Sequence, residues 1–166
     1  MQVTIPVKWV VVAAIVVVPA VVVWLLVDWL VVTDSERIRA VLDRTAAQAE
    51  AGDVDRLVDE NLDADFRLAG LDRERFRAWL KKALARYDVK GIRSYQTQDK
   101  VTGDTASATV RTVVQTGSIA GDQRVDWDVE MVKRPDDDWR ILSVKGYVWT
   151  GGDRVEWTSR IVQYAD

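Results

Sequence analysis

The longest apolar run of the chain lies near its N-terminus. Residues 9–27 carry no charge over 19 positions, and thirteen of these are Val, Ile or Leu. As an α-helix the run would be about 28 Å long, close to the roughly 30 Å hydrocarbon core of a bilayer. Trp9 at one edge, and Trp24 and Trp29 at the other, stand where aromatic belts form. The pattern predicts one transmembrane helix over about 9–29.

Two other interpretations of this run remain open. Val is a strand former, so two buried strands broken at Pro19 are also compatible with it. A cleaved signal peptide is the second alternative, although its apolar core usually spans about 7–15 residues and ends at a small-residue site. Here bulky residues at 21–26 follow the only Ala pair of the run. A retained anchor is therefore favoured, and we expect the following domain on the extracytoplasmic side of the cell membrane.

Beyond residue 32 the apolar positions recur first at helical spacing and then, after Gly91, at every second position. The helical part predicts three helices, over 34–51, in a short segment after Asp53, and from Asp72 to about Tyr87. The alternating part predicts strands over 92–101, 105–115, 123–133 and 139–150, with a short one at 66–68. Gly151 and Gly152 suit a two-residue hairpin turn. Residues 154–161 are then either a further strand or part of a terminal helix through Trp157, Ile161 and Tyr164.

Helices followed by a meander of long strands are typical of the α+β class. We expect three helices packed on a curved antiparallel sheet of four to six strands, behind the transmembrane helix. The predicted organisation is residues 1–32 with the membrane helix, residues 33–150 as the α+β domain, and residues 151–166 as a C-terminal extension.

Composition narrows the possible chemistry. The chain has 26 acidic and 23 basic residues and a net charge of −3, which argues against a nucleic-acid partner because binding to phosphate needs a basic face. It has no His and no Cys, which excludes disulfides and argues against zinc sites and against Cys or His-activated Ser nucleophiles. Acid–base chemistry would fall to Asp, Glu, Lys or Tyr. We expect no cofactor and no metal.

Four segments resemble a known superfamily. They are the helix around 38–42, Ala51-Gly52-Asp53 before a short helix, residues 62–66, and the closing strand at 139–144. In this order they are similar to the nuclear-transport-factor-2-like (cystatin-like cone) superfamily, which includes ketosteroid isomerase, scytalone dehydratase and the SnoaL-like cyclases. The resemblance covers about residues 34–148. It implies a cone-shaped domain in which the sheet curls around the helices and leaves a pocket.

The resemblance does not carry over the superfamily's catalytic residues. Ketosteroid isomerases use a Tyr on the first helix and an Asp near the first strand. These positions fall near Thr45 and near Ala69 and Gly70. Scytalone dehydratase relies on pocket His residues, which this chain lacks. The departure argues against enzymatic activity.

Three residues are candidates for proton transfer. Asp63 and Asp65 are expected near the pocket mouth, where paired carboxylates can split their pKa values and act as acid and base. A solvated turn is the alternative for these two residues. Tyr95 is the third candidate. The side chains proposed to line a pocket for a flat apolar ligand, with simple core packing as the alternative, are Phe66, Trp79, Tyr87 and Trp127.

Two charged patterns are expected on the surface. Asp126, Asp128 and Glu130 alternate along one strand, and we expect an outer sheet face on which they pair with Arg111, Arg124 or Arg140. The third helix carries six cations between positions 73 and 86. They form either a solvated face or a contact with anionic lipid.

These patterns favour a single-pass membrane protein whose small domain binds a ligand or assembles with a partner and has no chemistry of its own. The partner would be a second copy or a membrane protein, meeting the outer sheet face together with Trp149 and Trp157. The alternative is a membrane-tethered lyase, isomerase or hydrolase of SnoaL-like type. It would act on a small apolar substrate, with Asp63, Asp65 or Tyr95 as proton carrier.

Overall fold

A computed structural model describes residues 33–86, 89–116, 123–150 and 152–158. The chain divides into two units, 1–33 and 34–166, and the elements named here belong to the second. The predicted transmembrane helix lies outside the described residues, as do Ile161 and Tyr164 of the alternative terminal helix, whereas residues 153–156 form a strand as the other alternative predicts. Within the described residues no helix is both long and apolar enough to cross a bilayer.

Three helices form where the helical pattern predicts them. They are α2 (Asp34–Glu50), α3 (Val54–Asn61) and α4 (Arg73–Arg86). The carboxylate of Asp53 accepts the backbone N–H of Arg56 at 3.3 Å, and that of Asp72 accepts the N–H of Arg75 at 2.9 Å. Both residues thereby satisfy an otherwise unpaired amide in the first turn, which is why α3 and α4 begin at these positions.

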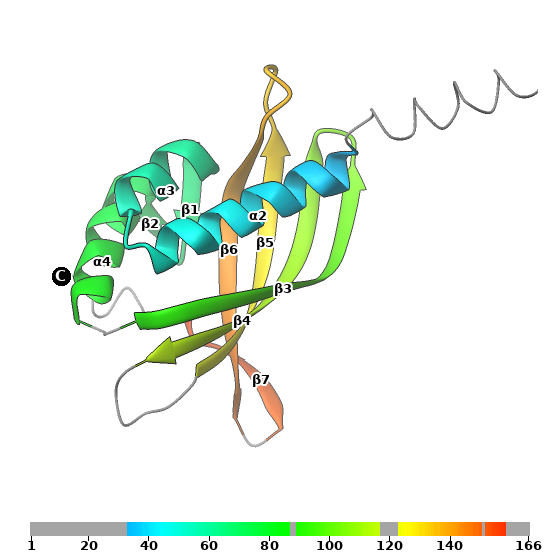
Figure 1. Cartoon of the computed structure of the whole chain (residues 1–166). Coiled ribbons are helices and arrows are strands. Elements are labelled where there is room, and N and C mark those ends of the chain that lie inside the picture. Colours follow the sequence, from blue (N-terminus) through cyan, green and yellow to red (C-terminus); the bar gives the residue numbers. More distant parts are fainter. Residues whose placement is uncertain (1–32, 87–88, 117–122, 151, 159–166) are drawn as a thin grey trace, which may run out of the picture. The chain divides into compact units, whose positions relative to one another are not determined.

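Seven strands form one sheet, and their bounds are β1 (Leu62–Leu68), β2 (Leu71–Asp72), β3 (Val89–Thr102), β4 (Thr105–Thr116), β5 (Gln123–Lys133), β6 (Trp139–Thr150) and β7 (Asp153–Glu156). The order across the sheet is β2-β1-β6-β5-β4-β3, and β7 pairs with β6. Thr150 pairs with Asp153, which confirms the predicted two-residue hairpin connection. Figure 1 shows α2 lying across the long curved strands, with α3 and α4 beside β1 and β2.

The sheet corrects two expectations. It has seven strands instead of four to six, and it is mixed because β1 runs parallel to β6, with Leu62 beside Ile141. Alternation of apolar residues reports which face of a strand is buried but not its direction, so the pattern did not distinguish the two cases. The added strand β2 has only two residues and follows a turn in which Ala69 and Gly70 both have positive φ.

The core lies between the helices and one face of the sheet. Ile38, Val58, Phe66, Met131 and Trp139 are its largest apolar side chains with less than 2% exposure. They come from α2, α3, β1, β5 and β6, so every layer contributes. We call the opposite side, which carries Arg111 of β4 and Asp126 of β5, the outer face.

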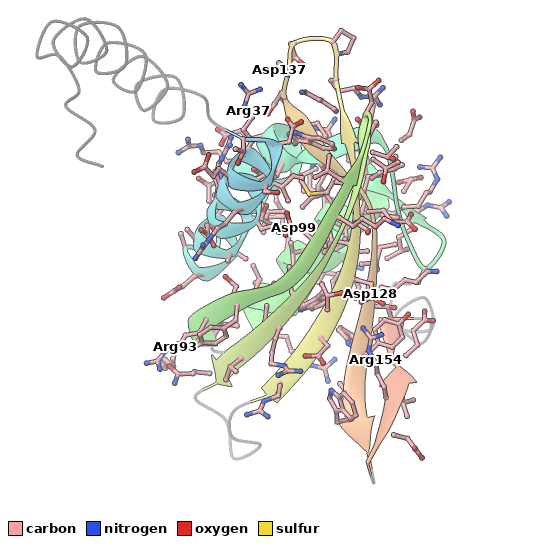
Figure 2. All side chains as sticks on the ribbon, turned by 90° about the vertical axis from the view of Figure 1, so that its right-hand side faces the viewer. Arg37, Arg93, Asp99, Asp128, Asp137 and Arg154 are labelled. Carbon is pink, nitrogen blue, oxygen red and sulfur yellow. The ribbon has the colours of Figure 1, made fainter. Side chains whose placement is uncertain are left out.

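The start of α2 is bonded to the hairpin between β5 and β6. The Asp34 carboxylate accepts Lys133 Nζ at 3.0 Å and Trp139 Nε1 at 3.0 Å. Arg37 forms an ion pair with Asp137 at the tip of the same hairpin, as Figure 2 shows. The two donors to Asp34 hold the pKa of its carboxyl below the usual value.

Candidate functional site

Strand register places a polar row across the outer face. Tyr95 pairs with Arg111, Arg111 pairs with Asp126, and Asp126 pairs with Tyr147. Directly paired residues of neighbouring strands point to the same side of a sheet, so these four side chains share the outer face.

One carboxylate organises the centre of this row. Asp126 Oδ1 accepts Arg111 Nε at 2.7 Å, and Asp126 Oδ2 accepts both Arg111 Nη2 at 3.1 Å and Trp149 Nε1 at 2.9 Å. The side chain of Asp126 is only 7% exposed. The Arg111 guanidinium, then the indole N–H, hold the pKa of Asp126 below its usual value despite this burial. Asp126 therefore stays ionised and fixes both neighbours in place.

A depression opens beside this carboxylate. It has a volume of about 310 Å³ and is lined by Arg111, Arg124, Val148 and Trp149. Arg124 is exposed and has no hydrogen-bond or ion-pair partner within the described part of the chain. Two guanidinium groups line the depression and one carboxylate lies beside it, so its net charge is about +1.

Exposed aromatic side chains flank the depression. Trp149 is 53% exposed and Tyr95 is 54% exposed, which is unusual for side chains of this size. The Trp149 indole is held by its bond to Asp126, so its exposed surface has a fixed orientation. We call Tyr95, Arg111, Arg124, Asp126 and Trp149 together the Arg–Trp site.

Two acidic residues near Asp126 on the outer face are already partnered. Asp128 Oδ1 accepts Arg154 Nη2 at 2.7 Å, and Figure 2 shows these two side chains pointing toward one another. Glu130 accepts the Ser143 hydroxyl at 2.6 Å. The ion-paired face expected from the sequence is therefore present, with Arg111 and Arg154 as the cations. Arg140 is not part of it, because it binds Asp138 and the Asp59 carbonyl.

The candidate carboxylates Asp63 and Asp65 lie together on β1 but differ in environment. The Asp63 side chain is 2% exposed and is paired with Arg134, whose Nε lies 2.6 Å from Oδ2. It also accepts the backbone N–H of Asp65 at 2.9 Å. Arg134 is the main cause of a lowered pKa at Asp63, which weakens it as a base. Asp65 points to solvent, with 79% of its side chain exposed.

Tyr95 lies far from these carboxylates. It is on β3 at one edge of the sheet, whereas Asp63 is on β1, and three strands separate β1 from β3 in the sheet order. The three candidates for proton transfer therefore do not converge on one point. At the position that corresponds to the isomerase Tyr, Thr45 donates its hydroxyl to the Val41 carbonyl at 2.7 Å.

The candidate pocket-lining residues separate into two aromatic groups. Phe66 is fully buried, with its ring centroid 5.1 Å from that of Phe76, and Phe76 stacks on Trp79 at 5.8 Å. Trp127 packs edge-on against Trp157 at 5.6 Å and donates its indole N–H to Thr112 at 2.7 Å. Trp79 and Trp127 are partly buried against the same core. Tyr87 lies outside the described residues.

Trp157 corrects one expectation. The sequence placed it with Trp149 at a partner surface, but it is packed against the core beside Trp127. Gly146 makes this possible, because a Cβ there would lie 2.7 Å from Trp157 Nε1 and 2.8 Å from a Trp127 ring carbon. The sequence pattern does not predict the bend after β7 that turns the Trp157 side chain toward the core.

Part of the positive charge of α4 is paired with two carboxylates of α3. Arg77 reaches Asp59 at 2.6 Å and Asp55 at 3.0 Å, and Lys81 reaches Asp55 at 2.7 Å. Lys81 and then Arg77 lower the pKa of Asp55, and Arg77 lowers that of Asp59. The pairing leaves less free charge on this face for a lipid surface than the sequence suggests.

Comparisons with known proteins address the fold. No family model matches the sequence, and the search of curated proteins found no match. Among solved structures, a protein of unknown function from Mycobacterium tuberculosis is 21% identical, with a TM-score of 0.57, covering 78% of this chain and 89% of its own. An NTF2-like protein with a cystatin-like fold from Novosphingobium aromaticivorans is 22% identical, with a TM-score of 0.56, covering 71% and 83%. The fold is nuclear-transport-factor-2-like.

One further solved structure with this fold is named after an enzyme. A candidate ketosteroid isomerase from Shewanella frigidimarina matches with a TM-score of 0.52 at 21% identity, covering 63% of this chain and 89% of its own. At such identities the likeness concerns the fold alone. The function of this chain must therefore be argued from its own side chains.

Sequence reasoning found part of the Arg–Trp site. It offered Arg111, Arg124 or Arg140 as partners of the acidic strand, of which Arg111 is paired with Asp126, and it placed Trp149 at a partner surface, where its side chain is exposed. It did not find that one carboxylate holds both, or that Arg124 stays without a partner in the described residues. It also missed Arg134, which is 71 residues from Asp63 in the sequence. No local pattern signals a pair so distant.

Proposed function

We propose that this chain is a membrane-anchored binding module without catalytic chemistry of its own, and that its domain docks an acidic segment of a partner protein at the Arg–Trp site. The observation that carries the proposal is that Arg124, a cation without a partner among the described residues, lines the same depression as the fixed, half-exposed indole of Trp149. Tyr, Trp and Arg are the residues most enriched at protein-interaction hot spots.

Charge complementarity favours an acidic partner. Arg111 and Arg124 exceed Asp126 by one positive charge, and Arg93, also exposed, adds another near Tyr95 on β3 (Figure 2). An acidic segment could bind Arg124 without breaking an ion pair that this arginine already makes within the described residues, so no free energy is lost in that step. The absence of convergence among Asp63, Asp65 and Tyr95 supports a binding role over the alternative of a SnoaL-like enzyme.

The docking part of the proposal is tested by site-specific photo-cross-linking in cells with the full chain. A photoreactive residue replaces Tyr95, or, as the matched control, the exposed Lys82 of α4. We expect a discrete adduct at position 95 that contains a peptide rich in Asp or Glu, and that is lost when Arg124→Glu is added. An adduct that contains a second copy of this chain, or that forms equally at position 82, would overturn the acidic partner.

The membrane part of the proposal rests on the uncharged run at 9–27. It is tested by washing membranes that contain the full chain with alkaline carbonate. We expect the chain to stay in the membrane pellet, and a topology reporter fused after Asp166 to be active only outside the cytoplasm. Release by carbonate would overturn the anchor, and a cytoplasmic reporter signal would overturn the orientation.

A further inference from the structure

We infer that the depression of the Arg–Trp site is a socket for a single carboxylate carried next to a flat apolar group, supplied by an acidic residue and a neighbouring aromatic residue of the partner. This inference rests on the proposed function and specifies its chemistry. It is carried by the positions of Arg111, Arg124 and Trp149 around the buried Asp126.

The charge of the depression selects the ionic group. Arg124 has all its N–H donors available within the described part of the chain, and its planar fork suits a carboxylate in bidentate geometry. Arg111 directs Nε and Nη2 to Asp126, so it acts mainly as a fixed positive charge. The negative charge of Asp126 disfavours a dianion such as phosphate. A net charge of about +1 therefore matches one carboxylate.

The walls of the depression favour a flat apolar group next to the carboxylate of the bound partner. The Trp149 indole is anchored through its N–H, 2.9 Å from Asp126 Oδ2, and is 53% exposed. Val148, the neighbour of Trp149 in β6, also lines the depression. A flat ring in offset stacking on an indole gains an attraction beyond that of the apolar area that it buries. Because the indole is already oriented, little conformational entropy is lost when a ring stacks on it.

The volume limits the size of the group. About 310 Å³ is near the lower end of small-molecule pockets, and it suits one bicyclic ring with a carboxylate or two adjacent side chains. The site is therefore a small anchor point within a larger contact. Tyr95, which pairs with Arg111 across the strands, lies on the side where the rest of a peptide would continue.

The test uses 2-naphthoate as the smallest probe with both features. The full chain, in mild detergent and with ¹⁵N-labelled tryptophan, is titrated while the indole N–H signals are recorded by NMR, and Trp149→Phe assigns the relevant signal. We expect the Trp149 signal to shift and saturate. Arg124→Gln should weaken binding about tenfold, whereas Lys82→Gln, which removes an exposed cation from α4, should leave it unchanged. The probe 2-naphthylmethanol, which has the ring without the charge, should bind at least about tenfold more weakly.

The outcomes separate this inference from the proposed function. Equal binding of naphthoate and naphthylmethanol, or no effect of Arg124→Gln, overturns the socket even if the cross-link at position 95 forms. Loss of that cross-link together with saturable naphthoate binding overturns the protein partner and leaves the carboxylate site standing. Acetate, which has the charge without the ring, should produce no saturable shift; if it binds as tightly as naphthoate, the role of Trp149 is wrong.

Discussion

Two Arg–Asp ion pairs of this domain have similar geometry but different surroundings. Asp63 and Asp126 are both almost fully buried at their side chains, and each is held by one arginine. Around Asp63 the remaining donor is a backbone N–H, from Asp65, in the same strand. Around Asp126 the remaining donor is an exposed indole, and Arg124, which has no partner among the described residues, lines the same depression as this indole.

The difference separates a structural ion pair from the ion pair at the proposed binding site. The Asp63–Arg134 pair joins β1 to the end of β5 and presents nothing further to solvent except Arg134 itself. The Asp126 pair holds in place groups that still have binding capacity. A buried carboxylate thus serves the fold in one place and orients a surface in the other.

The largest expected effect distinguishes the two carboxylates by stability. Asp63→Asn removes the charge that Arg134 binds, and it should lower the free energy of unfolding by about 2 kcal/mol, since hydrogen bonds to charged groups contribute roughly 1.5–3 kcal/mol. Asp126→Asn should cost about half as much, because its exposed neighbours are resolvated. Urea unfolding of the full chain in mild detergent, followed by circular dichroism, measures both.

The control for this comparison is Asp65→Asn. The side chain of Asp65 is 79% exposed, so this change should alter the free energy of unfolding by less than about 0.5 kcal/mol. If Asp65→Asn proved as costly as Asp63→Asn, the assignment of Asp63 as the structural partner of Arg134 would be wrong.

The next effect concerns the core side of β6. Gly146→Ala would place a Cβ within 3 Å of Trp157, Trp127 and Thr158, none of which can shift freely. We expect a loss of about 1.5 kcal/mol, within the range for overpacked cores. Gly91→Ala is the matched control, because its nearest neighbour is the flexible end of Gln115 at 3.2 Å. A smaller loss at 146 than at 91 would argue against the inward position of Trp157.

The pH dependence should show both pairs at once. The pKa values of Asp63 and Asp126 are lowered in the folded state, so each stabilises the fold above the ordinary Asp pKa of about 4 and loses that contribution as the pH falls. We expect stability to decline below about pH 4, and to decline less steeply in Asp63→Asn. Thermal melts between pH 7 and pH 2.5 measure the slopes. A variant with an unchanged slope would contradict the lowered pKa.

The smallest expected effect is at Arg124. It has no partner among the described residues, so Arg124→Gln should change the free energy of unfolding by less than about 0.5 kcal/mol. The same change should weaken the naphthoate interaction about tenfold. A substantial loss of stability would mean that Arg124 belongs to the fold, and the contrast between the two pairs would disappear.

Much of the fold follows from local pattern. Period 3.6 predicts helices that end within a residue or two of Glu50 and Arg86, and period 2 predicts all four long strands. The Asp residues before α3 and α4 mark their starts. These signals succeed because they depend on neighbours within a few positions, where backbone geometry links sequence to structure directly.

What could not be predicted depends on segments far apart in the chain. Three contacts can be seen only once the tertiary structure is known. They are the parallel pairing of β1 with β6, the bond between Arg134 and Asp63, and the ion pairs between α4 and α3. Alternation did place Arg111 opposite an acidic strand, since both residues occupy the outer set of positions. It contained no information on how Trp149 turns toward Asp126, because a rotamer depends on the three-dimensional surroundings.

The bonds of Asp34 and Arg37 to the β5–β6 hairpin have a mechanical consequence. The first turn of the domain is tied to a segment about 100 residues further along the chain. A force that pulls on residue 33 would therefore act through these bonds on β5 and β6, the two central strands of the sheet, as well as on α2. The strands that resist this force also carry Asp126 and Trp149. A pulling force at the start of the domain would therefore reach the strands of the Arg–Trp site.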